Sequence, residues 1–342
     1  MKVLGIETSC DECSASVVED GVKILSNVVA TQIPYHAPWN GVVPEIASRK
    51  HTEWIYAVTK EALDKAGLKA EDVDAVSVTN RPGLLGSLLV GLSFAKAFAW
   101  ARNIPFIAVD HMLAHLYAPF LISDAAETRA EYPFLGLLVS GGHTIICRAD
   151  NFDDIKILGT TIDDAAGEAF DKVAKFYNFG YPGGAVIDKM AQNGDSNAFR
   201  FPMPSLHKGD HRYDVSYSGI KNAVINQIDM FKIKDDYTND DIAASFQKTA
   251  VEILLRALLN AAEDTDITTI VAGGGVAANS YLRSRLSKKV NVHCIFPPLE
   301  LCGDNAAMIA GLGYNYLKRG ESSPLNVTAS ARVTGFKKKY PN

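Results

Sequence analysis

Long apolar runs and a strong net charge are both missing from this 342-residue sequence. The least polar stretch, residues 82–95, is too short to span a bilayer, and Lys96 ends it. The N-terminus reaches Glu7 too early for a secretory signal peptide. The formal net charge is only −5, so the chain lacks the overall basic character of many nucleic-acid-binding domains. We therefore expect a protein of the cytoplasm or of an equivalent matrix compartment. Any nucleic-acid partner would need a local basic patch or a helper subunit.

Cysteines are few, and their pattern contains no disulfide framework. There are five, an odd number, and they are widely scattered, which favours a reducing compartment. Cys10 and Cys13 form a C-x-x-C pair, but two acids lie between them and no second pair follows. We therefore do not expect a zinc or redox site at this pair.

Three common motifs of catalysis and nucleotide binding are also missing. No G-x-x-x-x-G-K-[ST] loop occurs, and the glycines at 273–275 do not form G-x-G-x-x-G, which disfavours P-loop and dinucleotide-binding proteins. His111 and His115 lack the glutamate of H-E-x-x-H, which disfavours a zincin-type protease.

The order of apolar runs predicts two α/β lobes of similar construction. Each lobe opens with three short strands whose first turn is polar, and helices and strands then alternate. Such a duplication predicts a two-lobed, actin-like fold of mixed sheets, similar to sugar kinases and Hsp70, with a ligand cleft between the lobes. Strands are predicted at residues 3–6, 14–18, 22–29, 73–78, 106–109, 134–139, 143–148, 155–160, 268–272 and 292–296.

Helices are predicted where apolar residues recur at helical spacing between these strands. Asp163 or Asp164 is the candidate N-cap of the helix that begins at residue 165. The predicted helices cover residues 44–66, 84–102, 111–121, 165–176, 242–262, 281–289 and 305–317.

The length of the chain favours two domains. We predict an N-terminal lobe of residues 1–121, on which the C-terminal helical region 304–330 packs back. The C-terminal lobe would comprise residues 133–303, and the polar stretch 122–132 would cross between the lobes. Residues 196–238 have little periodicity and are interpreted as an insertion in the second lobe.

Two histidines are the strongest candidates for a metal site. His111 and His115 are four residues apart, so on a helix they share one face and could bind one ion; histidines that only line or cap a helix are the alternative. A third ligand is needed, and Asp304 is a candidate because it lies just before a predicted helix. A plain N-cap is the alternative role of Asp304. Asp110 could cap the histidine helix or support a ligand.

Three polar or glycine-rich turns could carry substrate chemistry. Residues 7–12 gather three carboxylates and two hydroxyls; Asp11 and Glu12 are the candidates to orient a substrate or act as general base, and a solvated turn is the alternative. The turn at 140–142 has two glycines that let backbone N–H groups approach a phosphate, unless it is a simple hairpin. The glycines at 273–275 could hold an adenosine against the backbone.

Taken together, these segments resemble the TsaD family, the tRNA N6-adenosine threonylcarbamoyltransferases. The resemblance runs in order through nearly the whole chain. The segments that carry it are GIETSCDE (5–12), GVVPEIASR (41–49), PGLLGSLLVG (82–91), HMLAH (111–115), LVSGGH (138–143), IDDAAGEAFDK (162–172), YPGG (181–184), SYSGIK (216–221), GGVAAN (274–279) and CGDNAAMIA (302–310).

The resemblance implies transfer of a threonylcarbamoyl group from L-threonylcarbamoyl-adenylate to N6 of adenosine 37 in tRNAs that read ANN codons, which forms t6A. It implies one divalent metal ion, iron or zinc, on His111, His115 and Asp304, and a nucleotide site that would also accept ATP, ADP or AMP. The implied partners are tRNA, a smaller metal-free paralogous subunit (TsaB-like) and an ATPase subunit (TsaE-like). The resemblance implies no association with a membrane. The residues implied to contact the adenylate are Leu138, Val139, Ser140, Gly141, Gly142, Asp171, Gly184, Asp188 and Asn279.

The chain departs from the family pattern at a few positions without losing a predicted ligand. Arg81 stands where the family usually has glycine, and Leu113-Ala114 replaces the common Glu-Gly between the histidines. Arg81 could alter a surface contact. The alternative function is an ATP-dependent small-molecule kinase of the same fold, which would give the two histidines no role. The turn at 7–12 lacks the D-x-G-[ST] pattern expected of such a kinase.

Overall fold

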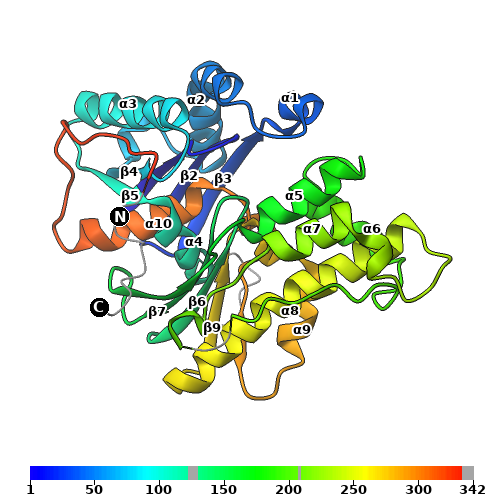
Figure 1. The fold of residues 1–342 in the computed structure, drawn as a ribbon. Coiled ribbons are helices and arrows are strands. Elements are labelled where there is room, and N and C mark those ends of the chain that lie inside the picture. Colours follow the sequence, from blue (N-terminus) through cyan, green and yellow to red (C-terminus); the bar gives the residue numbers. More distant parts are fainter. Residues whose placement is uncertain (122–129, 207–208, 333–342) are drawn as a thin grey trace. The chain divides into compact units, whose positions relative to one another are not determined.

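A computed structural model describes residues 1–121, 130–206 and 209–332. The chain divides into two compact units (Figure 1), Met1–Arg129 with Pro297–Phe336 (unit 1), and Ala130–Phe296 with Lys337–Asn342 (unit 2). Most of the predicted crossing at 122–132 lies outside the described residues.

Unit 1 contains a five-stranded mixed sheet in the order β3-β2-β1-β4-β5. The first three strands form an antiparallel meander, and β4 and β5 continue the sheet parallel to β1. The strands are β1 (Lys2–Glu7), β2 (Glu12–Glu19), β3 (Lys23–Thr31), β4 (Ala75–Arg81) and β5 (Phe106–Asp110).

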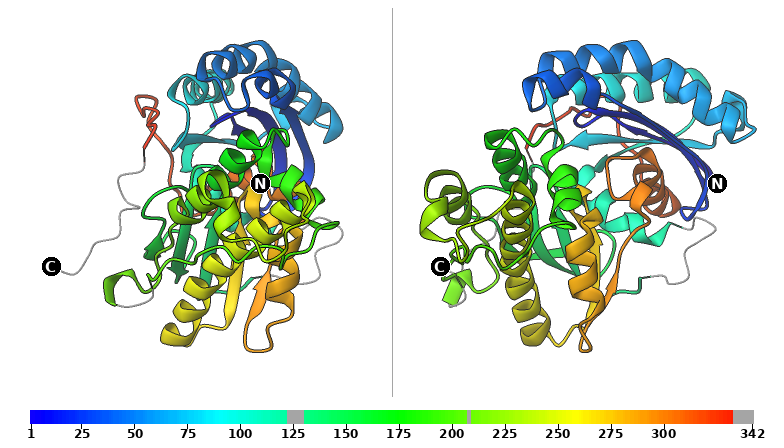
Figure 2. Two further views of the ribbon diagram at one scale, coloured as in Figure 1. Left: turned by 45° about the vertical axis from the view of Figure 1, so that its right-hand side comes forward. Right: turned by 90° about the vertical axis from the view of Figure 1, so that its right-hand side faces the viewer.

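Helices cover both faces of the unit 1 sheet. The short α1 (Ile33–His36) leads to α2 (Pro44–Lys65), which covers one face together with α3 (Leu85–Arg102); α10 (Ala306–Lys318) lies on the other face beside α4 (His111–Tyr117) (Figure 2). Successive side chains of a strand point to opposite faces. Leu4 and Ile6 of β1 therefore join the apolar core beneath α2 and α3, whereas Gly5 between them faces α10.

Small side chains on the second face let the backbone of α10 lie directly on the sheet. A Cβ atom on Gly5 would come within 2.2 Å of the Ala306 carbonyl oxygen and 2.9 Å of the Ala310 amide nitrogen. The Ser77 hydroxyl of β4 donates a hydrogen bond to the Ile309 carbonyl at 2.7 Å. The sheet therefore fixes the start of α10, the segment that Asp304 directly precedes.

The unit 2 sheet repeats the order and the strand directions of unit 1. Its order is β10-β9-β6-β7-β8, with an antiparallel meander of β6, β7 and β8 to which β9 and β10 add in parallel. The structure thus confirms the predicted duplication. The strands are β6 (Phe134–Val139), β7 (Thr144–Ala149), β8 (Ile155–Thr160), β9 (Thr269–Gly273) and β10 (His293–Ile295).

The helices of unit 2 are centred on the long α8, which packs against α6, α7, α9 and the sheet strands β6 and β7. The Phe170 ring of α5 meets the Phe246 ring of α8 edge to face at 5.0 Å. Aromatic pairs in this geometry contribute about 1 kcal/mol beyond the area that they bury. The helices are α5 (Ala166–Phe176), α6 (Gly183–Ala191), α7 (Ser218–Asn226), α8 (Asn239–Thr265) and α9 (Ser280–Ser287).

The segment interpreted as an insertion, residues 196–238, contains one regular helix, α7. One prediction in unit 2 is wrong. The N-cap of α5 is Ala165 and not Asp163 or Asp164. The Asp163 carboxylate instead accepts hydrogen bonds from the Tyr217 and Ser218 amides, so it ties the start of α7 to the end of the second meander.

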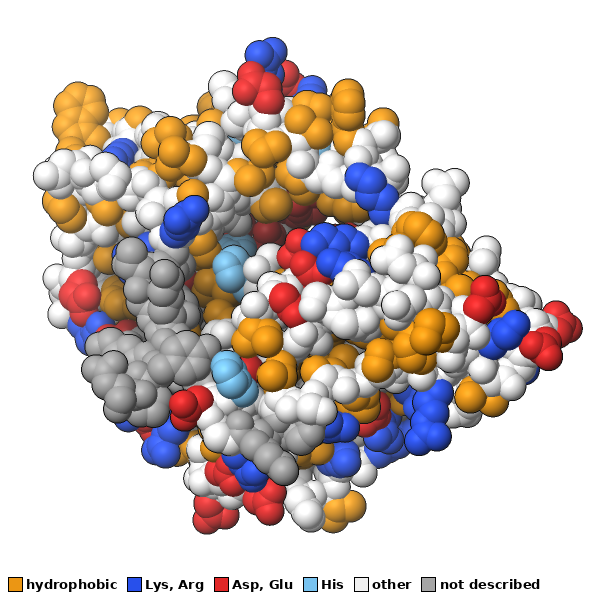
Figure 3. Space-filling view, viewed as in Figure 1, with side chains coloured by type: hydrophobic (Ala, Val, Ile, Leu, Met, Phe, Trp, Pro, Cys, Tyr) orange, Lys and Arg blue, Asp and Glu red, His pale blue; other side chains and the backbone are white. Residues whose placement is uncertain are grey.

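The surface carries charges of both signs. On the face drawn in Figure 3, acidic and basic side chains are intermixed with exposed hydrophobic ones. In unit 1, Tyr56 of α2 and Trp100 of α3 are largely exposed. No helix within the described part of the chain combines the length and the apolar character needed to cross a membrane.

Replacing Gly5 with alanine should displace α10 from the sheet. We expect G5A to lower the free energy of unfolding by about 3 kcal/mol or more, because the added Cβ meets backbone atoms that cannot turn away. Denaturant unfolding measures this loss. The control is S77A, which removes one hydrogen bond on the same face without adding volume and should cost about 1 kcal/mol. Equal losses in both variants would contradict the close-packing argument.

Candidate metal and nucleotide sites

The predicted histidine pair lies on the first turns of α4, which begins where β5 ends. The Asp110 carboxylate accepts hydrogen bonds from the backbone amides of Met112 and Leu113, and it thereby satisfies donors that a helix start leaves unpaired. Asp110 therefore has the capping role considered from the sequence. Arg81 also donates from Nε to Asp110 at 3.2 Å, so this departure from the family pattern contacts the cap of the histidine helix.

Three ligand atoms converge beside α4. The Nε2 atom of His115 lies 3.2 Å from Nε2 of His111 and 3.1 Å from Oδ1 of Asp304. The third pair, His111 Nε2 and Asp304 Oδ1, is 3.4 Å apart. One ligand atom from each of the three residues thus lies within 4.8 Å of the others, and all three residues belong to unit 1.

The donor set fits a divalent transition-metal ion. Two imidazole nitrogens that face each other cannot both offer lone pairs unless a proton or a cation lies between them. Two histidines and a carboxylate are typical ligands of zinc and of non-haem iron. The alternative role of Asp304 as an N-cap is wrong, because the side chain of Asn305 accepts the hydrogen bond from the Met308 amide and caps α10.

A buried glutamate stands behind His111. Glu7 is 0% exposed, and its Oε2 atom lies 3.0 Å from Nδ1 of His111. Burial disfavours a charge on His111, but the carboxylates of Asp304 and Glu7 outweigh it and raise the pKa of His111 to about 9. Burial and the charge of His111 together lower the pKa of His115. Without a metal ion, the pair therefore holds its proton on His111 near neutral pH.

Glu7 itself is a functional candidate that the sequence did not single out. Burial alone would raise the pKa of Glu7, yet the charge and the hydrogen bond of His111 lower it. The sequence offered one signal, an acidic residue at the end of an otherwise apolar buried strand. A polar turn follows this residue directly and accounts for an acid equally well, so the signal did not stand out.

The two candidate catalytic acids lie in the turn between β1 and β2. Glu12 begins β2 and accepts a hydrogen bond from the Thr31 hydroxyl at 2.9 Å. Burial, followed by the nearby charges of Asp11 and Asp304, raises the pKa of Glu12 to about 9. Glu12 is therefore protonated near neutral pH, so in this state it can donate a proton but cannot act as a base.

In unit 2, the turn after β6 packs against two other elements. The amide of Gly167, near the start of α5, donates to the Ser140 carbonyl at 3.2 Å. A Cβ atom on Gly167 would lie 2.8 Å from Cα of Gly141. Gly274, which follows β9, has a φ of 92°, and a Cβ there would lie 2.4 Å from the Val139 carbonyl oxygen. Both close approaches require glycine.

Further contacts connect α5 to α6 and α6 to α9. The Asp171 carboxylate of α5 accepts a hydrogen bond from the Gly183 amide at the start of α6 at 2.8 Å. Asp188 of α6 accepts from Nδ2 of Asn279 at 3.2 Å and from the Ser280 hydroxyl at 2.8 Å. Asn279 also caps α9 through the Leu282 amide.

These contacts close a ring within unit 2 that runs from β6 through α5 and α6 to Asn279 and back through Gly274. All of the residues predicted to contact the adenylate lie on this ring. The side chains of Leu138 and Val139 are buried in β6, so they can offer a ligand only backbone atoms. An added Cβ atom would meet nothing within 4 Å at four glycines of the ring, namely Gly141, Gly142, Gly184 and Gly275.

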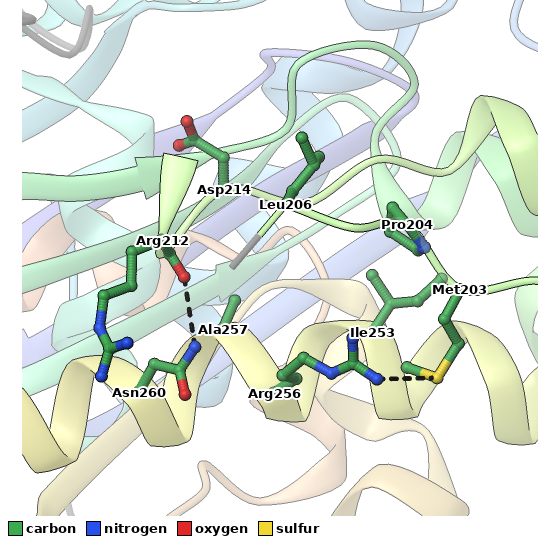
Figure 4. A pocket seen from close by; sticks show the side chains of 9 residues that line it. All are labelled: Met203, Pro204, Leu206, Arg212, Asp214, Ile253, Arg256, Ala257 and Asn260. Carbon is green, nitrogen blue, oxygen red and sulfur yellow. Dashed lines mark hydrogen bonds between the residues drawn. The ribbon is translucent and has the colours of Figure 1, made fainter. Parts of the chain in front are cut away.

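A hollow elsewhere in unit 2 contains none of the predicted site residues. It lies between α8 and two short stretches, residues 203–206 and 212–214 (Figure 4). Asn260 of α8 donates to the Arg212 carbonyl at 3.4 Å, and Nη2 of Arg256 lies 3.3 Å from the Met203 sulfur. These contacts attach the irregular segment to α8, and we assign no ligand to this hollow.

Comparison with known families identifies relatives along the whole chain. The family model described as "TsaD: tRNA N6-adenosine threonylcarbamoyltransferase" matches residues 23–311. The chain is 66% identical over 340 residues to the tRNA N6-adenosine threonylcarbamoyltransferase of Treponema denticola, with 99% of each protein covered. It is 53% identical over 342 residues to the enzyme of the same name from Borreliella burgdorferi, covering 99% of this chain and 96% of that protein.

Solved structures of lower identity share the fold. Component A of (R)-2-hydroxyglutaryl-CoA dehydratase from Acidaminococcus fermentans matches with a TM-score of 0.55 at 14% identity, covering 93% of this chain and 99% of that one. HypF of T. kodakarensis matches with a TM-score of 0.60 at 14% identity, covering 93% of this chain and 48% of that one. These neighbours confirm the predicted actin-like α/β fold. The names of the curated relatives do not favour the kinase alternative.

Replacing Glu12 with glutamine should stabilise the metal-free protein increasingly as the pH rises. Because the pKa of Glu12 is about 9 in the folded state against an ordinary value of 4.5, the folded protein binds more protons between these values, and its stability falls with pH there. E12Q removes this loss. The gain should grow by at most about 1.4 kcal/mol per pH unit, the limit for one proton.

Urea denaturation of the chelator-treated protein across this pH window measures the effect. Adding the metal ion should shrink it, because the charge of Asp304 is one of its causes. A difference between E12Q and the parent protein that stays constant with pH would show that Glu12 is already ionised at neutral pH.

Proposed function

The chain belongs to the TsaD family of tRNA N6-adenosine threonylcarbamoyltransferases, and we propose that it transfers the threonylcarbamoyl group of L-threonylcarbamoyl-adenylate to N6 of adenosine 37 in tRNAs that read ANN codons. The product would be t6A. The observation that carries the proposal is the convergence of His111, His115 and Asp304 in a chain that is 66% identical to a curated member of the family.

We propose that His111, His115 and Asp304 hold one divalent ion, either iron or zinc. As a Lewis acid, such an ion polarises a carbonyl group. Catalytic sites of this kind usually supply three protein ligands and keep one position open, and a substrate oxygen would take that position. The deep burial of His115 and the cap at Asp110 support the proposal, since both hold the histidine face of α4 in place.

The ring in unit 2 is proposed to bind the adenylate. Its uncovered glycines expose backbone N–H groups, and the turn after β6 and the start of α6 suit a phosphate. The junction after β9 would hold the adenosine. ATP, ADP and AMP share these parts and would bind in the same way. The proposed contact residues are Leu138, Val139, Ser140, Gly141, Gly142, Asp171, Gly184, Asp188 and Asn279.

In the proposed reaction the N6 amine of adenosine attacks the carbamoyl carbon. The new N6–C bond forms as the bond from that carbon to the adenylate phosphate oxygen breaks, and AMP leaves. One of the two acids, Asp11 or Glu12, would take the proton from N6, and the other would orient the reacting groups.

The partners of the reaction are also part of the proposal. We propose that the protein works in the cytoplasm on tRNA, together with a smaller metal-free TsaB-like subunit and a TsaE-like ATPase. The net charge of −5 supports a need for helper subunits, because binding to the phosphate backbone depends on clustered positive charge.

Replacing His111 with alanine should abolish tRNA modification. The assay combines the protein, its partner subunits, unmodified tRNA and supplied adenylate, and mass spectrometry of the digested tRNA measures t6A. We expect H111A to lower the rate by at least about 100-fold, because one metal ligand is lost. H293A, which removes an exposed histidine of β10, should match the parent protein. Undiminished modification by H111A would exclude the metal role, and ATP consumption on a small molecule without t6A would favour the kinase.

Replacing Gly184 with alanine should weaken nucleotide binding without destabilising the fold. Gly184 and Gly219 are each the second residue of a nine-residue helix, and a Cβ atom on either would meet nothing within 4 Å. Both alanine variants should gain about 0.5–1 kcal/mol of stability. Only G184A should lose affinity for AMP in calorimetric titration, by about tenfold or more, because its methyl group would occupy ligand space. Equal affinities in G184A and G219A would remove Gly184 from the proposed site.

A further inference from the structure

The buried carboxylate of Glu7 has no part in the bond-making steps of the proposed reaction. Glu7 is the last residue of β1, and two residues before it Gly5 faces α10. Because side chains two apart on a strand share a face, Glu7 points to the side of the sheet on which α4 and α10 lie. It is 0% exposed. An acid in such a position is costly unless every oxygen has partners.

Both carboxylate oxygens of Glu7 have partners, but the two oxygens have different ones. One oxygen, Oε1, accepts a hydrogen bond from the Ser9 amide. The other, Oε2, accepts from the Thr79 hydroxyl and lies 3.0 Å from Nδ1 of His111. The ring of His111 therefore stands between Glu7 on its Nδ1 side and the two other ligand residues on its Nε2 side.

We propose that Glu7 is a positioning residue for the metal site: it holds the Nδ1 proton of His111 and so presents the Nε2 lone pair to the metal. The inference rests on the metal site of the proposed function. A carboxylate on the far nitrogen of a metal-binding histidine fixes both the tautomer and the ring orientation, and it raises the basicity of the ligand. Glu7 is not itself a ligand, because its carboxylate meets the edge of the ring opposite to the ligand atoms.

The other histidine, His115, has no such carboxylate on its Nδ1 side in the described part of the chain. Its Nδ1 atom is buried and has no hydrogen-bond partner among the described residues. On its Nδ1 side, only packing holds the ring of His115, which is 1% exposed. Of the two histidines, only His111 has a carboxylate beside its Nδ1 atom, so removing Glu7 should change the tautomer of His111 and leave His115 as it is.

The test is E7Q, which keeps the size of the side chain but has only one acceptor oxygen. If the amide NH2 group faced the Ser9 amide, two donors would meet. The amide NH2 group would therefore face the Thr79 hydroxyl and His111, and donation to Nδ1 would move the ring proton to Nε2, the atom that binds the metal. We expect the zinc affinity of E7Q, measured by competition with a chelator, to fall by about 10- to 100-fold.

Two further measurements separate positioning from a structural role. In ¹⁵N–¹H correlation spectra of the two chelator-treated proteins, recorded at a pH at which His111 is neutral, His111 should carry its proton on Nδ1 in the parent protein and on Nε2 in E7Q. T79V, which removes a hydrogen bond to the same carboxylate oxygen but keeps the acid, should bind zinc with nearly the parent affinity. A folded E7Q protein with parent zinc affinity would overturn the proposal.

The remaining outcomes are also decisive. If E7Q does not fold, E7D decides: its shorter side chain withdraws the carboxylate from Nδ1, so weakened zinc binding supports the proposal and parent affinity overturns it. If the parent protein itself binds no zinc or iron, the metal site of the proposed function fails, whereas parent binding with an unaffected E7Q removes only the role of Glu7.

Discussion

The contact on which the candidate metal site depends is the close packing of α10 on β1. It exists because Gly5 has no side chain to separate the strand from the Ala306 carbonyl. Asp304 lies just before this contact. His111 directly follows β5, and β4 separates that strand from β1 in the sheet. Residues almost 200 positions apart are thereby brought within hydrogen-bonding distance. The chemistry of the site is thus set first by backbone packing and only then by the ligands themselves.

The electrostatic balance of the metal site follows from this placement. Glu7, Glu12 and Asp304 contribute acids around a single pair of histidines, and burial penalises every charge among them. In the metal-free state the balance leaves a proton on His111 and another on Glu12. A divalent cation would replace the positive charge of His111 and relieve the repulsion felt by Glu12. The arrangement therefore favours a metal ion over a purely structural role for the cluster.

The sequence predicted helices and strands well where the apolar periodicity was clear. It failed at helix ends, where two neighbouring residues could each cap the helix. The strands at 134–139 and 155–160 have their predicted bounds. The helix predicted at 111–121 ends as an α-helix at Tyr117, because Pro119 lies in a short 3-10 turn. Periodicity could not reveal that Asn305 rather than Asp304 caps α10, since both residue types cap helices equally well.

The same limit explains why the sequence did not single out Glu7, whereas it did single out the glycine-rich turns of unit 2. The glycine-rich segments of unit 2 carry their signal locally, because a tight turn needs particular residues in sequence. The partner of Glu7 lies 104 positions away, and no local pattern encodes it. The two sheets share one topology, yet unit 1 places ligating side chains beside its first strand where unit 2 places uncovered backbone. The shared topology of the two sheets therefore predicts at which strand ends a site can form. The residues at those strand ends determine what the site can bind.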